Sequence, residues 1–170
     1  MLTSSWERRY VSTVSATKQA QSNAPASYYR GGTSRAIIFQ RKHLPEDQAD
    51  WAHIFRKVIG SPDPHGRQLD GMGGGVSSLS KICIVEPAMD SGLDVDYTFI
   101  AIGVRDDEVD YSSNCGNMTS AIGPFAVDSG LVPVKSGQVE ATVRIRNTNT
   151  GKIIDATFPL DEECLSLIHI

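Results

Sequence analysis

The residues in this sequence with the clearest chemical potential surround Cys115, in the stretch Ser-Asn-Cys-Gly-Asn-Met-Thr at positions 113–119. Small polar residues flank the cysteine, and an apolar segment with helical periodicity follows it directly. We therefore expect Cys115 to lie at the N-terminus of a buried helix. Free N–H groups and the helix dipole at such a position lower the pKa of a thiol and bind anions. A nucleophile, an anion-binding site and a core cysteine all fit this pattern.

Two other turns resemble the Cys115 segment, because they also offer backbone N–H groups and hydroxyls rather than fixed charges. They span Arg30–Ser34 and Gly71–Lys81, and the cysteine turn itself spans Ser112–Met118. Together the three turns favour a ligand that carries carboxylates. Nucleotide binding is not indicated, since the glycine run at 73–75 is not a GxGxxG that opens a helix. The Ser-Lys pair at 80–81 also lacks the ending of a P-loop.

Strand and helix patterns alternate along the chain and place these turns between regular elements. Runs rich in β-branched and aromatic residues predict strands over Ser27–Arg30, Ala36–Gln40, Lys81–Val85, Val95–Val104, Val139–Arg146 and Lys152–Phe158. The last two are predicted to form a hairpin, because the Asn-Thr-Asn-Thr-Gly sequence between them is a strong turn signal.

Two helices are predicted. Pro45–Ile59 carries an apolar stripe at helical spacing, and Gly60 is expected to be its C-cap. Gly116–Ser129 is expected to be the core helix, with Gly130 as its C-cap. Pro124 lies inside this second helix and removes a backbone donor, so we expect a kink there.

The composition of the chain excludes several classes of protein. Its 170 residues include 16 Lys and Arg against 20 Asp and Glu, for a formal net charge of −4. This balance gives no basic stripe of the kind that nucleic-acid binding requires. No apolar run approaches the roughly 18 residues of a membrane span. We therefore expect a soluble protein with neither nucleic acid nor a membrane as partner.

The cysteines and histidines do not form a metal-binding pattern. The three cysteines are too few and too irregularly spaced for a disulfide framework or a CxxC metal site. Cys83 lies in an apolar strand and is expected to be a buried core residue. His43, His53 and His65 have neither metal-like spacing nor acidic partners, so we expect them at the surface. No metal site is predicted.

The N-terminal segment, residues 1–26, differs in composition from the rest of the chain. It is rich in Ser, Thr, Ala and Gln, and it carries Arg8, Arg9 and Lys18 against the single acid Glu7. A mitochondrial transit peptide and an ordinary disordered leader both fit this composition. The expected location is accordingly the mitochondrial matrix or the cytoplasm.

Several motifs occur in one order between about Tyr28 and Leu160. They are Arg-Gly-Gly-Thr-Ser at 30–34, Gly-Ser-Pro-Asp at 60–63, Asp-Gly-Met-Gly-Gly-Gly at 70–75, Ser-Lys at 80–81, Val-Asp at 109–110, Asn-Cys-Gly-Asn-Met at 114–118 and Gly-Pro-Phe-Ala at 123–126. In this order they resemble the PrpF family of aconitate, methylitaconate and oxalomesaconate isomerases. The resemblance implies an α+β fold like that of diaminopimelate epimerase, with a curved, mostly antiparallel sheet wrapped around a central helix. The helix after Cys115 would be that central helix.

The resemblance also implies a reaction. A cofactor-independent isomerase of this family moves a C=C bond in a di- or tricarboxylate such as aconitate, methylaconitate or methylitaconate. A proton leaves a carbon next to the activated alkene and returns to another carbon, which is acid–base chemistry. Matching positions assign the two proton transfers to Lys81 and Cys115, in an order that stays open. The implied carboxylate-binding residues are Thr33, Ser34, Ser77, Ser78, Gly116, Asn117 and Met118.

The sequence departs from the family pattern in two short segments and in length. Arg35 stands where a lysine is common, and Val-Ser-Ser at 76–78 replaces a more acidic loop, so substrate preference is expected to differ. Residues 27–160 correspond to the N-terminal half of the family. We expect residues 161–170 to be a tail outside the family pattern and the second domain to be absent. The cleft would then lack one wall, and the isolated half is expected to be inactive.

Two other functions follow from the same features. A non-catalytic carboxylate-binding module, or an accessory to an aconitase-like enzyme, would use the same turns without turnover. A homodimer of the half would rebuild a cleft with two lobes. The expected ligand is in each case a small di- or tricarboxylate.

Overall fold

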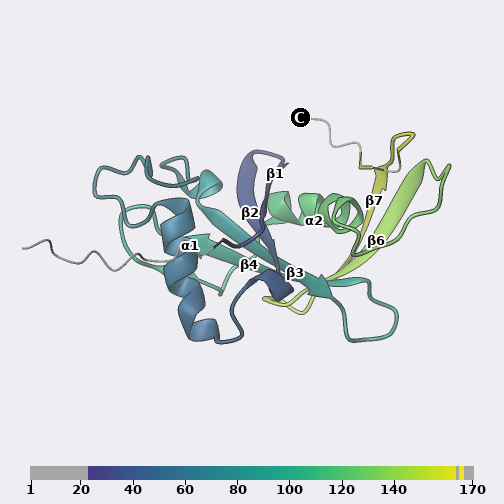
Figure 1. Cartoon of the computed structure of the whole chain (residues 1–170), viewed down its shortest axis with the longest axis horizontal. Helices are drawn as coiled ribbons and strands as arrows, with labels where there is room; N and C mark the ends of the chain where they lie inside the picture. Colours follow the sequence, from purple (N-terminus) through teal and green to yellow (C-terminus); the bar gives the residue numbers. More distant parts are fainter. Residues whose placement is uncertain (1–22, 164, 167–170) are drawn as a thin grey trace, which may run out of the picture.

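Seven β-strands form one sheet, and two α-helices flank it, within residues 23–163 and 165–166 that the computed structural model describes (Figure 1). The strands are β1 (Ser27–Gly31), β2 (Ser34–Gln40), β3 (Lys81–Pro87), β4 (Val95–Ile102), β5 (Val109–Asp110), β6 (Glu140–Asn147) and β7 (Ile153–Pro159). The helices are α1 (Trp51–Ile59) and α2 (Gly116–Asp128), with short 3-10 helices η1 (Arg41–His43), η2 (Gln48–Asp50) and η3 (Ser77–Leu79).

The sheet has the strand order β1-β2-β3-β4-β6-β7, and β5 pairs with the end of β4. Neighbouring strands are antiparallel except for the pairs β2/β3 and β4/β6, which are parallel. The helix α2 contacts both β1, the first strand in this order, and β7, the last, which requires the sheet to curl around it. Figure 1 shows α2 held between the β1–β2 and β6–β7 hairpins. These features confirm the predicted α+β fold with a mostly antiparallel sheet around a central helix.

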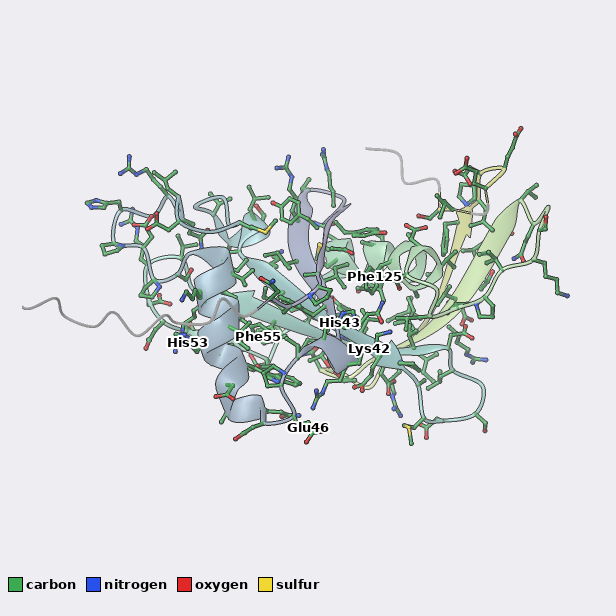
Figure 2. The ribbon with its side chains drawn as sticks, viewed as in Figure 1. Lys42, His43, Glu46, His53, Phe55 and Phe125 are labelled. Atoms are coloured by element: carbon green, nitrogen blue, oxygen red, sulfur yellow. The ribbon has the colours of Figure 1, made fainter. Side chains whose placement is uncertain are left out.

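Alternation along the central strands divides the buried residues between two hydrophobic clusters. On β2, Ala36 and Ile38 face the cluster around α2, whereas Ile37 and Phe39 face the cluster around α1. Successive strand residues point to opposite faces, so a strand buried on both faces is apolar throughout. Figure 2 labels one aromatic from each helix, Phe55 of α1 and Phe125 of α2. The sheet therefore has an inner face under α2 and an outer face under α1.

The central helix α2 is apolar almost all round, because the curled sheet covers most of its surface. Its residues from Met118 to Val127 are buried except Ser120. A Cβ added at Gly123 would lie 2.8 Å from the Phe158 ring, so glycine permits the close approach of β7. The helix runs without interruption through Pro124. The expected kink at this proline stays a prediction.

The predicted start of the first helix at Pro45 is wrong, since α1 begins at Trp51. The carboxylate of Asp47 accepts a hydrogen bond from the Ala49 N–H at 2.9 Å and begins the 3-10 turn η2. The carbonyl of Pro45 accepts from the Trp51 indole at 2.9 Å. These local bonds offer the backbone an alternative to the helix. Gly60, with φ of +85°, ends α1 as predicted.

The other boundaries differ from prediction by a few residues at most. The strand β4 stops at Ile102 rather than Val104, because the Gly103 N–H pairs with the Glu108 carbonyl and turns the chain back towards β5. The β6–β7 hairpin is confirmed. Residues 1–22 of the predicted leader lie outside the described residues, so the leader and the domain limits stay predictions.

Candidate active site

Three side chains that the sequence singled out meet at one point on the inner face of the sheet. The Nζ atom of Lys81 lies 3.2 Å from the Sγ atom of Cys115 and 2.9 Å from the Oγ atom of Ser34. The third side of this triangle, from Ser34 Oγ to Cys115 Sγ, measures 3.8 Å. The structure thus brings an amine, a thiol and a hydroxyl into direct contact.

Each of these side chains lies at the beginning of a regular element. Ser34 is the first residue of β2, and Lys81 is the first residue of β3. The two strands are parallel neighbours, so their N-terminal ends lie at the same edge of the sheet. Cys115 immediately precedes α2, whose N-terminus therefore meets that edge. This topology explains how Ser34 and Lys81 reach the Cys115 thiol although both are distant from it in sequence.

The surroundings of Cys115 lower the pKa of its thiol. Partial burial opposes ionisation, but the Met118 N–H and the side chains of Lys81 and Ser34 stabilise the thiolate and outweigh it. The charge of Lys81 adds to this effect. The ammonium of Lys81 also lies over the Phe99 ring, 5.7 Å from its centroid, where the aromatic face favours a cation. The pair is therefore suited to a thiolate beside an ammonium.

The β1–β2 turn packs directly on the first turn of α2. A Cβ added at Gly31 would lie 2.0 Å from the carbonyl oxygen of Asn117, so only glycine allows this approach. The Asn117 amide donates to Thr33 Oγ1 at 3.0 Å and lies 3.4 Å from Ser34 Oγ. Thr33 and Asn117 remain exposed at the rim of the site. Hydroxyl, amide and helix N–H groups thus converge beside the Lys81–Cys115 pair.

The remaining predicted binding residues have different places. Gly116 is exposed next to the thiol, and space around its Cα is open. The side chain of Met118 is fully buried in the core, so only its N–H faces the site. Ser77 and Ser78 lie in η3, which contacts β2, and no hydrogen bond joins their side chains to another described residue. Their role in binding stays a prediction.

Two asparagines that hold the segments around Cys115 in place, Asn147 and Asn149, were not predicted from the sequence. Asn114 Oδ1 accepts from the Cys115 N–H at 2.8 Å and from Asn147 Nδ2 at 3.3 Å. Asn149 pairs with both the N–H and the carbonyl of Phe99, at 2.7 and 2.9 Å, and donates to the Tyr111 carbonyl at 2.7 Å. Asn147 and Asn149 belong to residues 147–151, for which the sequence predicts only a hairpin turn. Nothing in that motif indicates a contact some 33 residues away in sequence.

The outer face of the sheet carries a separate feature. An open groove lies beside α1, and Lys42, His43 and His53 are among its lining residues (Figure 2). It lies on the opposite face of the sheet from Lys81. His53 and His65 are exposed as predicted, whereas His43 is half-buried. Among the described residues, no group of three His, Cys, Asp or Glu side chains is arranged to hold a metal ion.

The described part of the chain has no helix that is both long and apolar enough to cross a membrane. Its two α-helices have 9 and 13 residues.

The curled sheet thus carries an amine–thiol pair at the start of its central helix, where Lys81 and Cys115 lie 3.2 Å apart. The family described as "PrpF protein" matches residues 21–165, and the chain belongs to this family. This confirms the resemblance drawn from the ordered motifs.

Named relatives and a solved structure agree with this assignment. The chain is 43% identical over 147 residues to the 2-methyl-aconitate isomerase of Cupriavidus necator, covering 82% of this chain and 37% of the relative. It is 38% identical over 142 residues to the 3-methylitaconate isomerase of Eubacterium barkeri, covering 84% and 36%. The crystal structure of a methylitaconate-delta-isomerase superimposes with a TM-score of 0.78 and 37% identity, again over 84% and 36%. The chain thus spans little more than a third of the length of these isomerases.

Proposed function

We propose that this chain carries the thiol–ammonium half of an isomerase site that moves a C=C bond in a small di- or tricarboxylate by proton transfer. The observation that carries this proposal is the 3.2 Å contact between Lys81 Nζ and Cys115 Sγ, with a lowered thiol pKa. The contact provides one group that accepts a proton beside another that donates one.

The chemistry balances without oxidation or reduction. One group of the pair removes a proton from a carbon next to the activated alkene, which leaves an extended enolate. A proton then returns to another carbon, so the double bond has moved and the formula of the substrate is unchanged. In the ion-pair form the Cys115 thiolate is the base and the Lys81 ammonium is the acid. In the neutral form the two roles are reversed.

Groups around the pair suit the carboxylates of such a substrate. The N-terminus of α2 presents free N–H groups and a positive dipole end, which favour an anion beside Cys115. The side chains of Thr33, Ser34 and Asn117 supply further polar groups at the same point. Donors aimed at the enolate oxygen would lower the barrier to proton removal. The glycine-rich turn Gly71–Lys81, called the glycine loop below, carries Ser77 and Ser78 and completes the proposed binding set.

The proposed substrate class is an unsaturated branched di- or tricarboxylate of the aconitate, methylaconitate and methylitaconate type. It rests on the names of the relatives at 38–43% identity. Since the matched part is 36–37% of each relative, we expect the isolated chain to be inactive in net isomerisation and still to exchange substrate protons through the Lys81–Cys115 pair. A further domain or a second copy of the chain would supply the opposite wall.

The test is to incubate the purified chain with 2-methylaconitate, methylitaconate or trans-aconitate in D2O and to follow the carbon-bound protons by NMR. Deuterium uptake next to the alkene is expected and would support the proposal. Absence of both binding and exchange would overturn it for this chain. Exchange that survives Cys115→Ser combined with Lys81→Ala would overturn the assignment of the site.

Binding without exchange would favour the second function, a carboxylate-binding or accessory module. Light scattering in the same buffer addresses the homodimer, because only a dimer could rebuild a cleft from two halves. The location in the mitochondrial matrix or the cytoplasm stays a proposal, which labelling of the chain in cells would test.

A further inference from the structure

Gln68 is the described residue whose conformation stands out most clearly from ordinary protein geometry. Its side chain is 1% exposed although it is polar, and its φ of +53° lies in the left-handed region. It is the only non-glycine residue in the described part of the chain with a positive φ. Residues other than glycine rarely adopt this backbone conformation, and it persists where the surroundings hold it in place.

The side-chain amide of Gln68 is satisfied by three hydrogen bonds. Nε2 donates to Ser61 Oγ and to Ser80 Oγ, both at 2.8 Å, and Oε1 accepts from the Gly75 N–H at 2.9 Å. A Cβ added at Gly73 would lie 2.2 Å from Oε1. The glycine loop therefore wraps closely around this one amide group. A buried polar group bonded so completely specifies a single arrangement of its partners.

The backbone of Gln68 is held as firmly as its side chain. The Asp63 carboxylate accepts from the N–H groups of His65, Arg67 and Gln68, at 2.8, 2.9 and 2.6 Å. These bonds tie the turn after α1 into one compact unit. The Asp63 N–H donates to the Val104 carbonyl at 2.9 Å, which connects this turn to the chain just after β4.

The bond to Ser80 links Gln68 to the amine of the candidate site. Ser80 is fully buried, its Oγ donates to the Ile102 carbonyl at 2.8 Å, and its carbonyl accepts from the Ile102 N–H at 3.0 Å. Lys81 is the next residue, and it begins β3. The bond to Gly75 acts on the other side of the loop, just before η3 with Ser77 and Ser78.

We propose that Gln68 is a positioning residue that fixes the start of β3, and hence the Lys81 ammonium against the Cys115 thiol, and that it fixes the η3 turn in the same way. The proposal rests on the proposed function of the Lys81–Cys115 pair. Gln68 touches neither the thiol nor the amine. It acts through Ser80 and through the glycine loop.

The experiment measures the reactivity of Cys115, which requires no turnover. The rate of alkylation by iodoacetamide is followed against pH, and peptide mass spectrometry assigns each modified cysteine. In Gln68→Leu we expect the midpoint of the Cys115 profile to move upward by about one pH unit, since loss of a nearby opposite charge raises a pKa by that order. Lys81→Ala should move it by a similar amount, and the double variant should move it little further.

The matched control is Gln138→Leu. Gln138 also bonds backbone groups with both ends of its amide, but it lies in the loop before β6. The substitution Gln138→Leu should lower the melting temperature without moving the midpoint of the Cys115 alkylation profile. An unchanged midpoint in Gln68→Leu, whatever its melting temperature, would overturn the proposal.

If Gln68→Leu does not fold, Ser80→Ala is used instead. It removes the hydroxyl that joins Gln68 to the start of β3, and it should destabilise the fold less. An upward shift in Ser80→Ala supports the proposal, and an unchanged midpoint overturns it. A shift observed in a chain that shows no proton exchange would support the positioning role while the proposed isomerase function fails. The two proposals are thus tested separately.

Discussion

Cys83 and Cys115 belong to the same cluster around α2, yet the pKa values of their thiols shift in opposite directions. Cys83 is fully buried in the middle of β3, and desolvation raises the pKa of its thiol. Cys115 is partly buried at the start of α2, and the pKa of its thiol is lowered. Lys81 stands only two residues before Cys83 on the same strand. Position in the sheet, rather than residue type, therefore decides which thiol has the lower pKa.

Polar groups at the edge of the sheet differ in the same way from those in the core beneath it. At the edge, the polar groups of Ser34, Lys81 and Asn117 find partners around Cys115. In the core, the buried hydroxyl of Tyr97 makes no well-formed hydrogen bond to any residue that the structure describes. It lies near Cys83 and Thr119, and burial raises its pKa. The negative charge of an ionised thiol is stabilised at the edge, whereas burial disfavours a negative charge on Cys83 and Tyr97 in the core.

The largest expected effect comes from removing either member of the edge pair. Cys115→Ser and Lys81→Ala should each lower the rate of substrate proton exchange by about 10²- to 10⁴-fold, because one proton-transfer group is lost. The rate is measured by NMR in D2O. Cys83→Ala is the control, since it removes the core thiol and leaves the pair in place. A comparable loss in Cys83→Ala would abolish the distinction between the two thiols.

The next effect is a difference in reactivity between the thiols of the folded chain. Cys115 should react with iodoacetamide directly, whereas Cys83 should react only when the fold opens, at least about a hundredfold more slowly. Peptide mass spectrometry of a time course gives both rates. Urea above the unfolding transition should make them similar. Equal rates in the absence of urea would show that β3 does not shield Cys83.

A smaller effect is expected from crowding the contact that shapes the edge. Gly31→Ala should lower the free energy of unfolding by about 1–3 kcal/mol, because the new methyl group overlaps the Asn117 carbonyl. Urea denaturation measures this change. Gly116→Ala is the matched variant, since its added Cβ would meet no described atom within 4 Å apart from its chain neighbours and the backbone of its own helix. If the two substitutions cost the same, the close approach of the β1–β2 turn to α2 is not a determinant of stability.

The smallest effect is a pH dependence of opposite sign for the two thiols. The folded pKa of Cys115 is depressed, so its stabilisation is present above the unfolded thiol pKa of about 8.5 and is lost as pH falls through the folded value. The folded pKa of Cys83 is raised, so stability is lost as pH rises above about 8.5.

Urea midpoints measured near about pH 7 and about pH 9.5, on either side of an ordinary thiol pKa, test these signs. Relative to the parent chain, Cys115→Ser should steepen the alkaline loss of stability and Cys83→Ala should reduce it. Shifts of the same sign in both variants would contradict the comparison.

Much of the fold could be predicted from local patterns. The β6–β7 hairpin, the apolar helix after Cys115 and the helix end at Gly60 each depend on residues close in sequence. The predicted helix start at Pro45 failed because a local contact, from the Asp47 carboxylate to the Ala49 N–H, competes with helical hydrogen bonding. Such competition depends on side-chain geometry that periodicity does not report.

The candidate site, like the fold, could be predicted only in part from the sequence. Lys81 and Cys115 followed from the family motifs, and the structure places them in contact. The roles of Asn147, Asn149 and Gln68 did not follow, because their partners lie in other segments of the chain. A polar residue in a turn has the same local signature whether its side chain faces solvent or holds a distant loop.

The sequence by itself determined the family, the candidate site residues Lys81 and Cys115 and the helix that begins beside Cys115, because ordered motifs and periodicity are local properties. Only the tertiary structure decided that Lys81, Ser34 and Cys115 meet, since parallel pairing of β2 with β3 brings their N-terminal ends to one edge. The thiol pKa is likewise a tertiary property. It depends on an ammonium 3.2 Å away in space and 34 residues away in the chain.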